Sequence, residues 1–318
     1  MREYIIRRLL LVAPIMVGVS FLTYATFSII PGDAAVLICQ FNCTPETLKD
    51  IRHDLGLDKP FYEQYGDWLG GIFKGDLGES FFTHLPVTTE LGQRLPVTGE
   101  LVGLSLTLAL LLGIPPGVLS AIRPGTPLDW VARFVSVIWL SVPSFYLATL
   151  IIAFGAAWFH WSPPQFGSAG TVSLFEDPWL NLQTFFFPSI VLAVGISAVI
   201  MRLTRSSMLE VMRNDYIRTA WSKGLRERAV VWRHALKNAM IPVATIIGLQ
   251  LGALIGGAVI IESVFNLNGI GKYLLEAILR RDLLVVQSLV LMFAVVYIVA
   301  NLIVDLAYAW LDPRIRYG

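Results

Sequence analysis

Six long stretches without a charged residue constrain the fold of this chain more than any other feature. Each has at least 22 residues, and they cover 9–30, 101–122, 134–159, 178–201, 238–261 and 283–304. At a rise of about 1.5 Å per residue, a helix of that length crosses a hydrocarbon layer about 30 Å thick. The composition agrees, because 55% of the residues are hydrophobic and only 15% are charged. The sequence therefore predicts an all-α polytopic membrane protein with six transmembrane helices.

The positive charges are distributed unequally between the two sides that six spans define. With both termini in the cytoplasm, sixteen Lys and Arg residues lie inside and eight lie outside. Cytoplasmic loops of membrane proteins carry the excess of Lys and Arg. We therefore expect a multi-pass protein whose N- and C-termini are both cytoplasmic.

These spans divide the chain into three parts. Residues 1–30 hold the first span, and residues 31–97 form an external loop. Residues 98–318 form a core domain with spans two to six and a cytoplasmic loop at 202–242.

The external loop carries its own helix signals. Thr44, Pro45 and Glu46 have the order of an N-cap, a first-position proline and an acid in the first turn of a helix. Gly56 ends that helix, and aromatic residues at helical spacing predict another one before residue 74. We expect a small helical cap on the external membrane surface.

Two cysteines, Cys39 and Cys43, follow the first span on the side predicted to be oxidising. A disulfide between them is possible if the backbone bends, and two free thiols are nearly as compatible with the spacing.

Prolines and glycines inside the spans predict how the helices pack. Pro115, Pro116 and Pro143 remove backbone donors, so we expect the second and third spans to kink inside a bundle. The fifth span has small residues at a spacing of four, which predicts close packing at Gly248, Gly252, Gly256 and Gly257.

The cytoplasmic loop at 202–242 is the most basic part of the chain, with nine Lys and Arg against three acids. Met208, Met212, Tyr216 and Ala220 would form one apolar stripe if they belong to a single helix. Lys223 and Gly224 then predict the end of that helix, and a second short helix is expected at about 227–238. Charge alone would also fit a loop that binds anionic lipid.

The amino-acid sequence of this loop favours a more specific function. DYIRTAWSKGL (215–225) and RHALKNAMIP (233–242) resemble the signature loop of binding-protein-dependent ABC importer permeases of the peptide/nickel family. LGLDKPFYEQYGDWL (55–69) and GDLGES (75–80) are similar to the external loop of the B-type subunits of that family. The resemblance extends over nearly the whole chain and implies a type I ABC importer-like permease of the bacterial inner membrane.

The resemblance also implies roles for individual residues. In this family the loop forms coupling helices that dock into a groove of the ATP-binding subunit. The implied coupling residues are Asp215, Tyr216, Arg218, Thr219, Ala220, Lys223, Gly224 and Leu225. The wider superfamily begins the motif with Glu-Ala-Ala, whereas this chain has Arg218-Thr219-Ala220, so the role of that glutamate is not carried over.

A second motif follows the fifth span. Residues 262–265 and 269–271 resemble the external re-entrant segment of the family. The implied gate or binding-protein contacts are Glu262, Phe265, Gly269 and Gly271. At the end of a span Glu262 would cost little if it were hydrated, so its position alone does not establish a function.

The sequence lacks the motifs of catalysis. It contains no phosphate-binding G-x-x-x-x-G-K-[ST] motif and no His/Cys/Asp/Glu set with metal-ligand spacing. We therefore expect a non-catalytic subunit without a cofactor, with ATP and Mg held by partner subunits.

The leading hypothesis is half of the translocation path of an ATP-driven importer. Its expected partners are a second permease, two ATP-binding subunits, an external substrate-binding protein and membrane lipid, with no nucleic acid. Dipeptides or oligopeptides are the first expectation, with nickel chelates, glycosides or other small solutes as alternatives. The sequence does not decide between these solutes. An ion-coupled secondary transporter or an intramembrane enzyme would need ionisable groups inside the spans, which the six runs do not provide.

Overall fold

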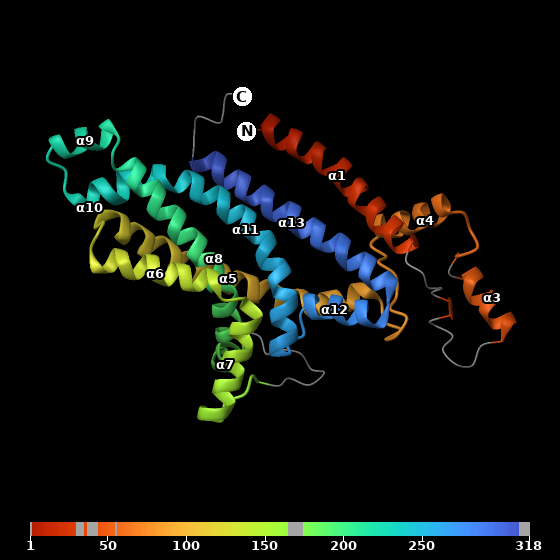
Figure 1. Ribbon diagram of the computed structural model, residues 1–318. Coiled ribbons are helices and arrows are strands. Elements are labelled where there is room, and N and C mark those ends of the chain that lie inside the picture. The colour runs from red at the N-terminus through yellow and green to blue at the C-terminus, as the bar shows by residue number, and fades with distance from the viewer. Residues whose placement is uncertain (1, 30–34, 37–43, 55, 165–173, 312–318) are drawn as a thin grey trace. The chain divides into compact units, whose positions relative to one another are not determined.

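The computed structural model describes residues 2–29, 35–36, 44–54, 56–164 and 174–311 (Figure 1). Within these ranges every regular secondary-structure element is a helix. They are α1 (Arg2–Ile29), α3 (Pro45–Asp54), α4 (Phe61–Phe73), α5 (Val87–Ile122), α6 (Pro127–Ser141), α7 (Ser144–Phe159), α8 (Pro178–Val211), α9 (Asp215–Ser222), α10 (Glu227–Ala229), the π-helix η1 (Val230–Ala235), α11 (Leu236–Phe265), α12 (Ile270–Arg280) and α13 (Leu283–Leu311). Cys39 and Cys43 lie outside the described residues.

Four helical segments of the described chain are long and apolar enough to cross a membrane. They are α5, α8, the continuous helix Glu227–Phe265, and the part of α13 from Leu283 to Leu302. The bent pair α6 and α7 makes a fifth if it is counted as one span. Helix α1 occupies the position of the predicted first span, and its apolar part, Val12–Thr26, is shorter. The all-α polytopic prediction is confirmed, while these criteria give four or five spans rather than six.

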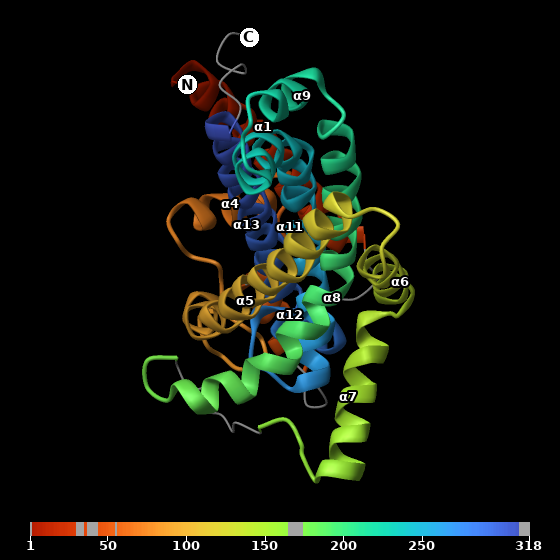
Figure 2. The same cartoon turned by 90° about the vertical axis from the view of Figure 1, so that its left-hand side faces the viewer.

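Pro143 does more than kink the third span. Helix α6 ends at Ser141, and α7 begins at Ser144 with an axis turned by 95°. Val142 is extended, as the residue before a proline prefers, and Pro143 cannot donate to the preceding turn. Figure 2 shows α7 leaving the end of α6 at this sharp angle.

By contrast, Pro115 and Pro116 lie inside α5, which runs unbroken from Val87 to Ile122. This helix approaches α8 closely at two glycines. A Cβ atom would lie 2.8 Å from Ile200 Cγ2 at Gly113 and 2.7 Å from the Met201 carbonyl oxygen at Gly117. Close packing therefore depends on glycines of the second span.

Of the glycines predicted to pack closely in the fifth span, Gly256 does not and Gly257 does. A Cβ atom at Gly256 would meet nothing within 4 Å, and one at Gly257 would lie 3.0 Å from Leu192 Cδ2. At Gly256 the predicted close approach is thus absent.

The chain forms two compact units. The first contains 96–272 and the end of α13 from Val299. In it α8 packs against α6, α7 and α11, because its apolar residues face them on several sides. Its core includes Leu101, Phe185, Ile200, Leu254 and Ile261.

The second unit contains 2–95 and 273–298. Here α1 packs on α4 through the aromatic rings of Phe21, Tyr24, Phe61, Tyr65 and Trp68. The predicted start of α3 is confirmed, because the Thr47 N–H donates to Thr44 Oγ1 at 3.2 Å. Gly56, with φ +63°, lies just after this helix, as expected.

Candidate functional site

The first candidate site begins where α8 ends. Residues after Val211 turn, and α9 starts at Asp215 behind the extended N-cap residue Asn214. The predicted single stripe is therefore wrong, because the helix is interrupted between Met212 and Asp215. Met208 is buried on α8, whereas Tyr216 belongs to α9 and is half-exposed.

Gly224 ends α9 with a left-handed turn, as the sequence predicts. Its φ is +74°, its N–H donates to the Trp221 carbonyl at 2.9 Å, and the Leu225 N–H reaches the Ala220 carbonyl at 3.4 Å. These two bonds form a Schellman motif, in which glycine is preferred because a side chain at positive φ is strained.

Helix α9 has one buried and one exposed side. Ile217 and Ala220 are buried in an apolar cluster with Met208 of α8, Val118 of α5 and Val231 of η1. Through this cluster α9 packs against α5, α8 and the continuous helix that includes η1.

The other side of α9 is accessible and carries charged, polar and aromatic side chains, Trp221 among them. The side chains of Asp215 and Arg218 are 95% and 74% exposed and lie 3.4 Å apart. Tyr216 Oη accepts a hydrogen bond from Asn238 Nδ2 at 2.8 Å, which ties α9 to α11. The remaining predicted coupling residues are exposed as well, namely Thr219, Lys223, Gly224 and Leu225.

The second helix of the loop is not a separate element. Helix α10, η1 and α11 run as one continuous helix from Glu227 to Phe265. Figure 1 shows α9 and α10 folded back on each other at the end of α8. A displacement of α9 would therefore act directly on the long α11 helix through the contacts of η1.

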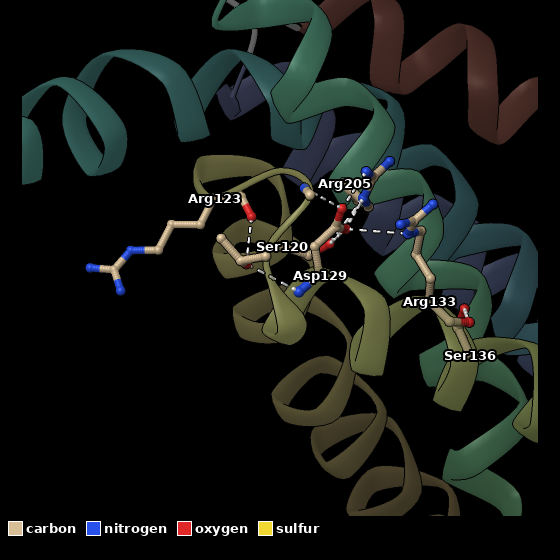
Figure 3. Close-up of polar contacts among 8 residues, drawn as sticks. Ser120, Arg123, Asp129, Arg133, Ser136 and Arg205 are labelled. Atoms are coloured by element: carbon tan, nitrogen blue, oxygen red, sulfur yellow. Dashed lines mark hydrogen bonds and ion pairs between the residues drawn. The ribbon is translucent and has the colours of Figure 1, made fainter.

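A buried ion pair at the same end of this unit escaped the sequence analysis. Asp129, 1% exposed, accepts hydrogen bonds from Arg205 Nε at 2.7 Å and Nη2 at 3.1 Å. Ser120 Oγ and the Gly125 N–H also donate to its carboxylate, at 2.5 and 3.0 Å (Figure 3). The pair thereby joins α5, α6 and α8. Thr126-Pro127 signals a helix start, but nothing in the sequence links Asp129 to a residue 76 positions away.

The external candidate residues form a second constellation in the first unit. Glu262 is 0% exposed, so its carboxylate is not hydrated by bulk water although it lies at the end of a span. Its Oε1 accepts from Thr98 Oγ1 at 2.6 Å, and its Oε2 accepts from the Lys272 N–H at 2.9 Å. The Ile270 N–H in turn donates to Thr98 Oγ1 at 2.8 Å. These hydrogen bonds take the place of the water molecules that the Glu262 carboxylate loses on burial.

The neighbouring residues leave little free space around this carboxylate. A Cβ atom at Gly269 would collide with the Glu262 carboxyl group, and one at Gly271 would lie 2.5 Å from Val259 Cα. Phe265 is buried in the core, and the Leu267 N–H donates to the Glu262 carbonyl at 2.8 Å. Glu262, Phe265, Gly269 and Gly271 thus fix the reversal between α11 and α12.

Comparison with known proteins assigns the chain to a family. A family model described as "Binding-protein-dependent transport system inner membrane component" matches residues 113–317, and the model of its N-terminal part matches 1–102. The chain belongs to this family. As an inner membrane component of transport systems it is a permease subunit and not an enzyme.

Curated relatives of this permease cover its full length. It is 37% identical to the dipeptide transport system permease protein DppB of Alkalihalophilus pseudofirmus, over 100% of both chains. It is 38% identical to DppB of Escherichia coli, over 100% of this chain and 99% of that one. The resemblance to peptide-family permeases is confirmed.

A solved structure shares the fold of the permease. The MetNI methionine ABC transporter, in inward-facing conformations, superposes with a TM-score of 0.55 at 17% identity, covering 70% of this chain and 96% of that chain. In the part of the permease that the structure describes, no group of three or more His, Cys, Asp or Glu residues could hold a metal ion.

Proposed function

We propose that this permease is one of two membrane subunits of an ATP-driven, binding-protein-dependent importer of dipeptides or oligopeptides. Each permease would form half of the translocation path, two ATP-binding subunits would dock on the cytoplasmic side, and an external binding protein would deliver the solute. The full-length similarity to permeases named for dipeptide transport supports the solute class.

The observation that carries the coupling proposal is the construction of α9. Its apolar side is buried against three long helices, whereas its polar side, with Asp215 and Arg218, is free for a partner. An amphipathic helix that lies in the membrane surface would instead need its apolar side available to the lipid, whereas Ile217 and Ala220 are buried in the protein. The proposed coupling residues are those of the α9–Gly224 turn, Asp215, Tyr216, Arg218, Thr219, Ala220, Lys223, Gly224 and Leu225.

The proposed orientation follows from this docking. The end of the first unit with α9 faces the cytoplasm, as do both termini. Glu262, Phe265, Gly269 and Gly271 then act on the external side, where they hold the reversal next to which the binding protein delivers its solute.

Transport by the reconstituted complex tests the proposal. The permease is co-expressed with its partner subunits, placed in liposomes, and assayed for uptake of a labelled dipeptide with binding protein outside and ATP inside. We expect uptake to need both ATP and the binding protein. Uptake that follows an imposed ion gradient without ATP would instead support a secondary transporter. Competition by a nickel chelate or a glycoside, but not by peptides, would reassign the solute.

A further inference from the structure

A groove between α6 and α8 lies beside the Asp129–Arg205 ion pair. Its volume is about 730 Å³, within the usual range for a site that holds a small ligand. One wall is the side of α6 with Arg133, Val137 and Leu140, and the opposite wall includes Val199, Arg202 and Leu203 of α8.

The polarity of the groove changes along its length. Helix α6 runs away from the ion pair and α8 runs toward it, so Leu140 and Val199 lie farthest from the ion pair along the groove. They are eleven residues after Asp129 and six before Arg205, which corresponds to roughly 16 and 9 Å along the two helices. The groove thus has arginines at the end nearest α9 and aliphatic side chains beyond them.

The cationic end has more positive charge than its own acid neutralises. Arg133, Arg202 and Arg205 line it, and the single carboxylate of Asp129 is held by Arg205 through two N–H groups. Arg133 Nε lies 3.5 Å from that carboxylate and makes no hydrogen bond in the described structure. Arg202 is exposed and has no ion pair among the described residues. In Figure 3 the guanidinium groups of Arg133 and Arg205 both approach the Asp129 carboxylate.

We propose that this groove binds an anionic phospholipid. The phosphate lies at Arg133 and Arg202, because guanidinium groups bind phosphate oxygens with paired N–H donors. One acyl chain lies along Val137, Leu140, Val199 and Leu203, where it gains van der Waals contacts with their apolar side chains. With the orientation of the proposed function, the lipid belongs to the inner leaflet, whose anionic headgroups attract cations close to the surface.

Lipid retention measured by native mass spectrometry tests this site. The purified importer complex is equilibrated with equal amounts of phosphatidylglycerol and phosphatidylcholine of matched acyl chains. We expect the unmodified complex to retain phosphatidylglycerol preferentially. In the Arg133→Gln/Arg202→Gln variant this preference should fall roughly twenty-fivefold, at about fivefold for each arginine.

A matched control separates the groove from general surface charge. Arg213→Gln/Arg226→Gln removes the same charge from exposed positions outside the groove and should leave the preference unchanged. Equal losses in the two double variants would overturn the proposal. If the first variant does not assemble, Arg202→Gln alone serves, since Arg202 takes no part in the described ion pairs.

The apolar end has its own test. Val137→Trp fills the groove without a change in charge and should lower the retention of phosphatidylglycerol by at least tenfold. A phosphatidylglycerol with a photoreactive acyl chain should label residues 136–140 and 199–203. A cysteine at position 140 that cross-links to the second permease, without lipid labelling, would show that a protein covers the groove and would overturn the proposal. Displacement of the lipid by a dipeptide would do the same.

Discussion

The Thr98 hydroxyl on α5 donates a 2.6 Å hydrogen bond to the buried carboxylate of Glu262 on α11, across 164 residues of sequence. The same hydroxyl accepts the N–H of Ile270, the first residue of α12. This pair therefore connects the second span to the chain reversal after the fifth. Because of these hydrogen bonds, the Glu262 carboxylate lies in the protein interior although it is at the end of a span.

Glu262→Gln should destabilise this reversal. The single amide oxygen can replace only one of the two carboxylate oxygens. Either the Thr98 hydroxyl or the Lys272 N–H would then face an NH₂ group, and this buried donor without an acceptor costs about 1–3 kcal/mol of folding free energy. We expect a lower melting temperature of the purified complex and reduced uptake. Glu63→Gln on the exposed side of α4 is the control and should leave both unchanged. Unaltered melting of Glu262→Gln would contradict the network.

Gly269→Ala should disturb the same reversal by steric overlap. Its Cβ atom would collide with the Glu262 carboxyl group, and such overpacking costs about 1–3 kcal/mol. Gly256→Ala is the matched control, because a Cβ atom there meets nothing within 4 Å. Thermal unfolding of the two variants side by side gives the comparison. Equal melting temperatures would show that the reversal adapts without strain.

Gly224→Val should uncouple ATP hydrolysis from transport. A Cβ atom at this position meets no neighbour, so the cost is the strain of a β-branched residue at φ +74°, about 1–2 kcal/mol. Membrane insertion and assembly should persist, whereas ATPase stimulation by the loaded binding protein and uptake are lost. Gly224→Asn should retain more activity, because asparagine tolerates this conformation.

The control for this coupling prediction is Arg226→Gln/Arg228→Gln, which removes exposed cations from the same loop and should be milder. A loop that serves to bind lipid predicts the opposite order. Normal transport by Gly224→Val together with loss in the arginine variant would refute the coupling role.

Asp129→Asn should destabilise the packing of α5, α6 and α8. It leaves the Arg205 guanidinium without its carboxylate in a mostly buried position, and breaking a buried pair costs about 3–5 kcal/mol. Asp215→Asn is the control, because its pair with Arg218 is exposed and should contribute little. Fluorescence-detected size exclusion after heating measures both. Similar loss in the two variants would mean that burial adds nothing to the pair.

The predicted topology can be tested with single cysteines. Pro60→Cys and Ser222→Cys lie at exposed positions of α4's start and of α9, in a chain with Cys39 and Cys43 replaced by serine. An impermeant maleimide added outside intact cells should label position 60 and leave position 222 unlabelled. Labelling of both from outside would exclude cytoplasmic termini with six spans.

Local features of the fold were predictable from sequence. Uncharged runs of at least 22 residues indicate where the helices lie, because a helix lets such a segment satisfy its own backbone groups inside a membrane. Thr44 and Gly224 mark helix ends, since capping depends on the residue itself and on neighbours within five positions. The signature around Gly224 also indicated the family.

Tertiary structure alone decided the rest. Pro143 separates two helices by 95°, whereas Pro115 and Pro116 stay inside one helix, although their local chemistry is the same. The partners of Asp129 and Glu262 are 76 and 164 residues away. A carboxylate's burial and hydrogen bonds depend on which distant helix packs against it, and no local pattern of residues specifies that choice.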